Sequence, residues 1–101
     1  MKFLIITSIK EFEKDTLRLF KKANITAFSN VDVNGFKTQN TENLIDNWFS
    51  SSTDNVNSIL FFTFTKKEKI DILLEEVKIF NSNNKSNNPL RAIVLDVEKF
   101  V

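Results

Sequence analysis

Apolar residues occur in this chain in four short runs bounded by polar residues, a pattern that predicts four β-strands. The expected strands cover residues 3–6, 25–35, 59–64 and 91–97. The first run is continuously apolar, which is typical of a central strand buried on both faces. The second run alternates between apolar and polar residues from Val31 onward and ends at Gly35, the only glycine of the chain.

Two amphipathic helices are expected between these strands, at residues 9–23 and 66–80. In the second helix, apolar residues recur at i, i+3, i+4 and i+7 from Ile70 to Val77. A Ser/Thr-x-x-Glu sequence precedes each helix, beginning at Ser8 and at Thr65. This sequence predicts a capping box at the start of both helices.

The order strand–helix–strand occurs twice, which predicts an α+β, ferredoxin-like βαββαβ fold. Right-handed crossovers place both helices on one face of a four-stranded antiparallel sheet. The 101 residues are expected to form a single domain, 1–101. Phe, Leu and Ile dominate the strands, so the second face of the sheet is also expected to be apolar. Such a face normally marks an interface, and we expect the chain to associate with itself.

Two polar stretches interrupt this pattern. The longer, residues 37–58, contains the only tryptophan, Trp48. Loops longer than about 12–15 residues are uncommon in small domains and are usually functional or disordered. The shorter stretch, 81–89, is rich in Asn and contains no glycine. Function is therefore expected to depend on what the 37–58 segment contacts.

Composition narrows the classes of function. Fourteen basic and thirteen acidic residues leave a net charge of +1, so no nucleic-acid partner is expected. The chain has neither Cys nor His, which excludes disulfides, thiolate chemistry and His-based catalytic sets. We expect neither an enzyme nor a metal site. No apolar run approaches the length of a membrane span, so no membrane insertion and a cytoplasmic protein are expected.

Four segments, spread over the whole chain in order, resemble the PII signalling family and its PII-like relatives. They are Met1 to Ile6, Ala23 to Phe28, Val33 to Gln39 and Ile93 to Glu98. The resemblance implies a homotrimer in which the bare sheet faces meet around a central axis. It also implies that adenine nucleotides bind between subunits, at the base of a long T-loop and at a glycine-rich B-loop. T-loops of this family contact a protein target, often a membrane transporter or an enzyme.

The resemblance selects five candidate ligand-binding residues by position: Gly35, Lys37, Gln39, Lys85 and Arg91. An arginine at the position of Arg91 can bind a phosphate through two parallel hydrogen bonds. The chain also departs from the family pattern. Lys37 replaces a T-loop glycine, the B-loop segment 81–89 has no glycine, and the T-loop tyrosine modified in some members is absent.

Three apolar residues of the long segment, Leu44, Trp48 and Phe49, share one side of a short expected helix and are candidate partner-binding residues. A tryptophan in such a loop is typical of an interaction hot spot. The alternative is that this turn packs on its own trimer.

Three interpretations of function remain open at this point. The first is a PII-like regulator that controls a partner protein through the T-loop. The second is a sensor that binds a small ligand or nucleotide at the subunit clefts and has no protein target. The third is an RRM-like RNA-binding module, since that class shares the βαββαβ order and has aromatic residues on the third strand. The basic and glycine residues of the RRM strand motif are absent from 59–64, which weighs against the third.

Overall fold

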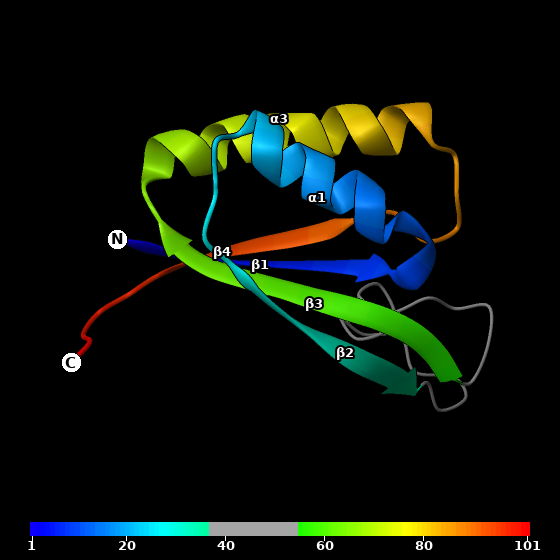
Figure 1. Cartoon of the computed structure of the whole chain (residues 1–101), viewed down its shortest axis with the longest axis horizontal. Coiled ribbons are helices and arrows are strands. Elements are labelled where there is room, and N and C mark those ends of the chain that lie inside the picture. Colours follow the sequence, from blue (N-terminus) through cyan, green and yellow to red (C-terminus); the bar gives the residue numbers. More distant parts are fainter. Residues whose placement is uncertain (37–54) are drawn as a thin grey trace.

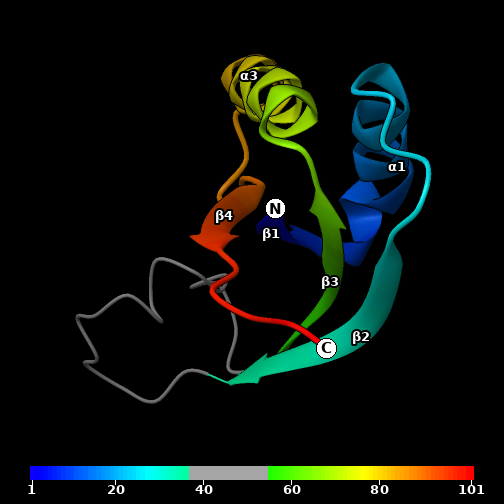
Figure 2. The same ribbon diagram turned by 90° about the vertical axis from the view of Figure 1, so that its left-hand side faces the viewer.

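The computed structural model describes residues 1–36 and 55–101, which form four strands and two α-helices (Figure 1). In chain order the elements are β1 (Lys2–Ile9), the 3-10 turn η1 (Lys10–Phe12), α1 (Glu13–Lys22), β2 (Ser29–Phe36), β3 (Asn55–Thr65), α3 (Lys67–Asn83) and β4 (Arg91–Asp96). The strands form one antiparallel sheet in the order β2-β3-β1-β4. Both helices lie on the same face of the sheet (Figure 2). The predicted ferredoxin-like α+β fold is therefore confirmed.

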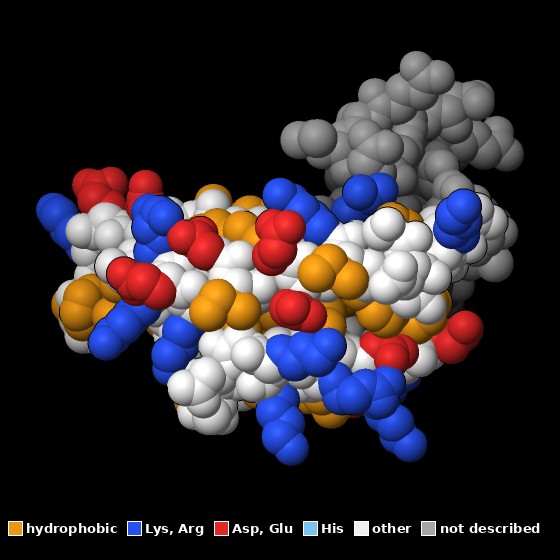
Figure 3. All heavy atoms as spheres, turned by 90° about the horizontal axis from the view of Figure 1, so that it is seen from above, with side chains coloured by type: hydrophobic (Ala, Val, Ile, Leu, Met, Phe, Trp, Pro, Cys, Tyr) orange, Lys and Arg blue, Asp and Glu red, His pale blue; other side chains and the backbone are white. Residues whose placement is uncertain are grey.

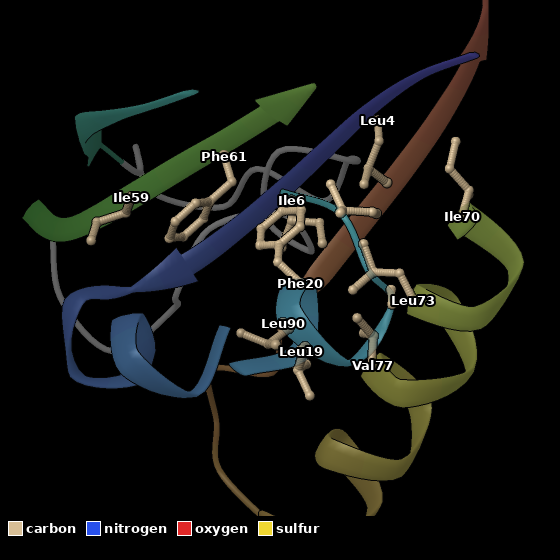
Figure 4. Close-up of a cluster of buried hydrophobic side chains, with 12 residues drawn as sticks. Leu4, Ile6, Leu19, Phe20, Ile59, Phe61, Ile70, Leu73, Val77 and Leu90 are labelled. Atoms are coloured by element: carbon tan, nitrogen blue, oxygen red, sulfur yellow. The ribbon is translucent and has the colours of Figure 1, made fainter. Parts of the chain in front are cut away.

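The core lies between the sheet and the two helices (Figure 4). Alternate residues of β1, Leu4 and Ile6, point to the helices and are fully buried, as is Phe61 of β3. From the helices, Phe20 of α1 and Leu73 of α3 are buried against them. This side-chain alternation follows from the period of two along a strand, whereas the apolar positions of the helices recur at a period of 3.6.

The face of the sheet opposite the helices carries a second set of apolar side chains. Among its members, Val31, Phe64, Ile93 and Leu95 are between 39% and 55% exposed. Phe3 of β1 pairs with Phe64 of β3 and with Leu95 of β4, and the Phe3 and Phe64 rings lie 4.7 Å apart. We call this surface the open face. Within residues 1–36 and 55–101 no element covers it, in keeping with the apolar second face that the sequence predicts.

The prediction of capping boxes at Ser8 and Thr65 is wrong, because neither residue caps a helix. Ser8 lies within β1, paired with Ile59, and its hydroxyl donates to the Ile9 carbonyl. The helix caps are Phe12 and Lys66, and neither donates or accepts a side-chain capping bond. Pairing of β1 with β3 extends each strand by a residue or more, and this shifts the helix starts beyond the Ser and Thr that could have capped them.

Element boundaries also differ from the prediction, among other places at β2, β3 and α3. β2 begins at Ser29, because residues 25–28 carry the chain from the helical layer to the sheet. The buried hydroxyl of Thr63 donates to the Ala27 carbonyl at 2.6 Å and fixes this passage. β3 begins at Asn55, so residues 55–58 belong to a strand and not to the polar excursion. α3 continues to Asn83, which shortens the following loop.

Candidate functional site

The described candidate ligand residues, Gly35, Lys85 and Arg91, lie toward one end of the sheet. Because the strands are antiparallel, β1 and β2 end there while β3 and β4 begin there. At this end the chain leaves β2 after Phe36 and returns to β3 at Asn55, and the loop from α3 reaches β4 (Figure 1). The family resemblance assigns ligand-binding residues to two connections, from β2 to β3 and from α3 to β4. Both connections join the sheet at this end.

A single chain does not bring all the described candidates together. Gly35 lies in β2, opposite Val56 of β3, whereas Arg91 opens β4 opposite Thr7 of β1. Two strands separate β2 from β4, so these two residues lie at opposite edges of the sheet, about 14 Å apart across the strands at ordinary spacing. They are also staggered along the strands, because Arg91 is level with Val31, four residues before Gly35. Lys85 and Arg91 belong to the same connection and are both exposed. The structure thus divides the candidates into a β2 group and a β4 group.

The connection from α3 to β4 is held by side-chain amides. Asn81 donates from Nδ2 to the Leu90 carbonyl at 3.0 Å, and its Oδ1 accepts from the Leu90 amide at 2.9 Å. Leu90 itself is buried in the core. The two bonds fix the start of β4 on the last turn of α3, and so they also fix the position from which Arg91 projects.

One polar atom of this connection has no hydrogen-bond partner among the described residues. The side-chain oxygen Oδ1 of Asn88 is buried, although the residue as a whole is partly exposed. Its backbone amide donates to the Ser86 hydroxyl at 3.0 Å. The sequence does not single out Asn81 or Asn88, since in a run of similar polar residues only the fold distinguishes a buried amide from an exposed one.

Among the described residues, the cations on the β4 side of this end have no acidic partner. Among the described residues, no carboxylate lies within 4.0 Å of Lys85 or Arg91. On the β2 side, Lys10 pairs with Asp32 at 3.1 Å. Over the helical face, basic and acidic side chains are interspersed with apolar ones (Figure 3). Within the described part of the chain, the two β4 cations can therefore meet an anionic group without breaking an ion pair.

The pKa shifts of the described residues lie outside this end of the sheet. A hydrogen bond from Lys2, together with the lysine's charge, lowers the pKa of the Asp96 carboxyl at the end of β4. Asp71 accepts a hydrogen bond from Lys67 in the first turn of α3 and raises the pKa of that lysine. Both groups are exposed to solvent, so these ion pairs are weak contributors to stability.

A shallow hollow of about 620 Å³ lies at the other end of the sheet, lined by Met1 and by residues 64–69. It contains none of the candidate ligand residues. Within residues 1–36 and 55–101, no group of three or more acidic, His or Cys side chains is placed to hold a metal ion. No helix of the described part is long and apolar enough to cross a membrane.

Several candidates fall outside the described residues. These are Lys37 and Gln39 of the ligand set and Leu44, Trp48 and Phe49 of the partner set. Their roles remain predictions from the sequence.

The chain matches no protein-family model and no curated protein. Its fold is that of PII-like proteins, as a comparison with solved structures shows. CPII, a nitrogen regulatory PII-like protein from Thiomonas intermedia K12 solved with ADP, AMP and bicarbonate, matches with a TM-score of 0.61. The match covers 99% of this chain and 94% of that chain at 15% sequence identity. The resemblance found in the sequence is thus confirmed at the level of the fold.

Proposed function

We propose that this chain is a PII-like regulatory protein, a non-enzymatic homotrimer that binds an adenine nucleotide and controls a partner protein in the cytoplasm. The observation that carries the proposal is the agreement of nearly the whole chain with the fold of a PII-like protein solved with ADP and AMP. The four sequence segments that resemble the family support it independently, because they lie in the same order along the chain.

Self-association follows from the open face. Val31, Phe64, Ile93 and Leu95, with Phe3 of β1 between them, form an apolar surface across all four strands, and such surfaces normally mark an interface. A trimer built through this face also brings an edge of one sheet close to a neighbouring sheet. That arrangement would let the β2 group of one copy and the β4 group of another form one ligand site.

Adenine nucleotide is the proposed ligand because of the chemistry of the β4 group. Lys85 and Arg91 are exposed cations with no carboxylate nearby in the described structure, and a guanidinium can bind phosphate oxygens in a bidentate manner. Gly35, Lys37 and Gln39 would contribute from the β2 side of a neighbouring subunit.

The ligand claim is tested by isothermal titration calorimetry with ADP at fixed ionic strength. Arg91→Ala should weaken ADP binding by roughly tenfold or more, because a charge-assisted hydrogen bond to phosphate is lost. Arg18→Ala is the matched control, since Arg18 is an exposed arginine of α1 that pairs with Asp15. If both variants bind ADP with the affinity of the wild type, Arg91 is not part of the ADP site.

The partner claim concerns the segment between β2 and β3. We propose that Leu44, Trp48 and Phe49 contact a protein target, with a membrane transporter as the target class that the family resemblance implies. Capture of a partner by the immobilised protein should weaken for Trp48→Ala while the oligomer size stays constant. Undiminished capture would favour the alternative, a ligand sensor with no target bound through this segment.

A further inference from the structure

The hollow at the end of β3 has an apolar part and a basic part. Met1 and Phe64 provide the apolar part, and residues 65–69, at the end of β3 and the start of α3, complete the lining. Phe64 is 55% exposed, so much of its ring is open to an incoming group. The volume of about 620 Å³ lies within the range of about 300–1,000 Å³ that is typical of ligand pockets. The hollow therefore has room for a side chain from outside.

Three lysines give the hollow its positive charge. Lys66, Lys67 and Lys69 share the lining with a single acidic residue, Glu68. Lys67 is paired with Asp71 at 2.7 Å. Among the described residues, no carboxylate lies within 4.0 Å of Lys66 or Lys69. These two lysines can therefore meet an acidic group from outside, next to an apolar surface.

Residues 97–101, which we call the tail, leave the sheet at the same end as the hollow. β4 ends at Asp96, and the Val97 amide then donates to the Met1 carbonyl at 3.5 Å. Beyond this bond the tail runs away from the sheet, on the side opposite the helices (Figures 1 and 2). Phe100 is 73% exposed, so its ring is not buried within its own chain.

The tail carries the side chains that the hollow would accept. In an extended continuation of β4, side chains two residues apart point to the same side, so Glu98 and Phe100 lie together, about 7 Å apart. The Phe100 ring can then pack on Phe64, and the Glu98 carboxylate can pair with a lysine of the hollow. Aromatic and charge complementarity thus both match the tail to the hollow.

We propose that the tail of one copy docks in the hollow of the next copy, where Phe100 packs on Phe64 and Glu98 meets the lysines. A neighbouring copy is the partner because the tail points away from the helical side of its own chain, on which α3 begins. Two different surfaces meet in this contact, and such head-to-tail contacts can close into a ring. The inference rests on the proposed homotrimer, in which three of these contacts complete the ring.

The chain has no cysteine, so the contact can be tested by cross-linking two introduced thiols with a short bismaleimide. One chain carries Val101→Cys, and a co-expressed chain with a different tag carries Glu68→Cys, which keeps all three lysines of the hollow. A mixed dimer should appear on a denaturing gel. Phe100→Ala in the first chain should lower its yield roughly tenfold, because the aromatic anchor is lost. Ile79→Cys in place of Glu68→Cys is the matched control and should give no mixed dimer, since Ile79 is an exposed residue of α3 outside the hollow.

A charge exchange separates docking from chance collision of a free tail. Lys66→Glu with Lys69→Glu should abolish the mixed dimer, and Glu98→Lys in the first chain should restore it. Failure to obtain a mixed dimer from a trimeric protein, or a yield that does not change with Phe100→Ala, would overturn the tail contact and leave the trimer standing. A wild-type protein that sediments as a monomer would overturn the homotrimer and the tail contact together.

Discussion

At the scale of single residues, a side-chain amide fixes the connection between α3 and β4. Asn81 uses both its donor and its acceptor on one residue, Leu90, and so joins the end of α3 to the start of β4. A sequence rich in asparagine does not reveal which amide has this role. The distinction arises only when the fold buries Leu90 in the core.

Asn81→Ala should lower the free energy of unfolding by about 1–3 kcal/mol, because the amide and carbonyl of the buried Leu90 lose their partners. Urea denaturation followed by circular dichroism measures the change. Asn83→Ala, at the exposed last residue of α3, should change it by no more than about 0.5 kcal/mol. A similar loss in both variants would show that the bonds from Asn81 to Leu90 contribute nothing particular.

At the scale of elements, α1 ends in a Schellman motif with asparagine in the position that glycine commonly occupies. Asn24 has a φ of 57°, its amide donates to Lys21, and the amide of Ile25 donates to Phe20. The buried Ile25 and Phe20 supply the accompanying apolar contact. This motif turns the chain back toward the sheet before β2 begins.

Asn24→Ala should destabilise the fold by about 1 kcal/mol, because a side chain with a Cβ but no local hydrogen-bonding group is unfavourable at positive φ. Asn24→Gly serves as the control and should match or exceed the wild-type stability. Thermal unfolding of the three proteins under one buffer condition makes the comparison. Equal stability of the alanine and glycine variants would contradict the role given to the left-handed backbone.

At the scale of the whole molecule, the apolar pattern predicted the fold well and local signals predicted its boundaries poorly. The run from Phe3 to Ile6 identified a central strand, whose Leu4 and Ile6 are buried under the helices while Phe3 and Ile5 are half-buried on the open face. Ser8 and Thr65 suggested helix caps, but long-range pairing of β1 with β3 overrode that local preference. The roles of Gly35 and Arg91 remain predictions from the sequence, and the fold adds that one lies near the end of β2 and the other opens β4. The role of Asn81 could not be identified without the fold, because only the fold brings its amide to Leu90.

The open face leads to a prediction about the oligomeric state of the protein. The double substitution Ile93→Lys and Leu95→Lys should convert the proposed trimer to monomers, because the new lysines of every copy would be brought together in an apolar interface. Sedimentation equilibrium measures the mass. Ile72→Lys with Ile79→Lys is the matched control, since these two isoleucines of α3 are similarly exposed but lie on the helical side. If the wild-type protein is a monomer at micromolar concentration, the proposed homotrimer is wrong.

The position of β1 in the sheet has a consequence for how the chain folds. β1 comes first in the sequence but pairs only with β3 and β4 among the described strands, and its contact between Lys2 and Asp96 spans 94 residues. Contacts of such separation slow folding, because the intervening chain must be closed into a loop first. During synthesis at about 5–20 residues per second, the apolar side chains of β1 stay without their partner strand for several seconds, until β3 has been synthesised. Shielding of this nascent strand, by chaperones or by the ribosome surface, should therefore raise the yield of native protein.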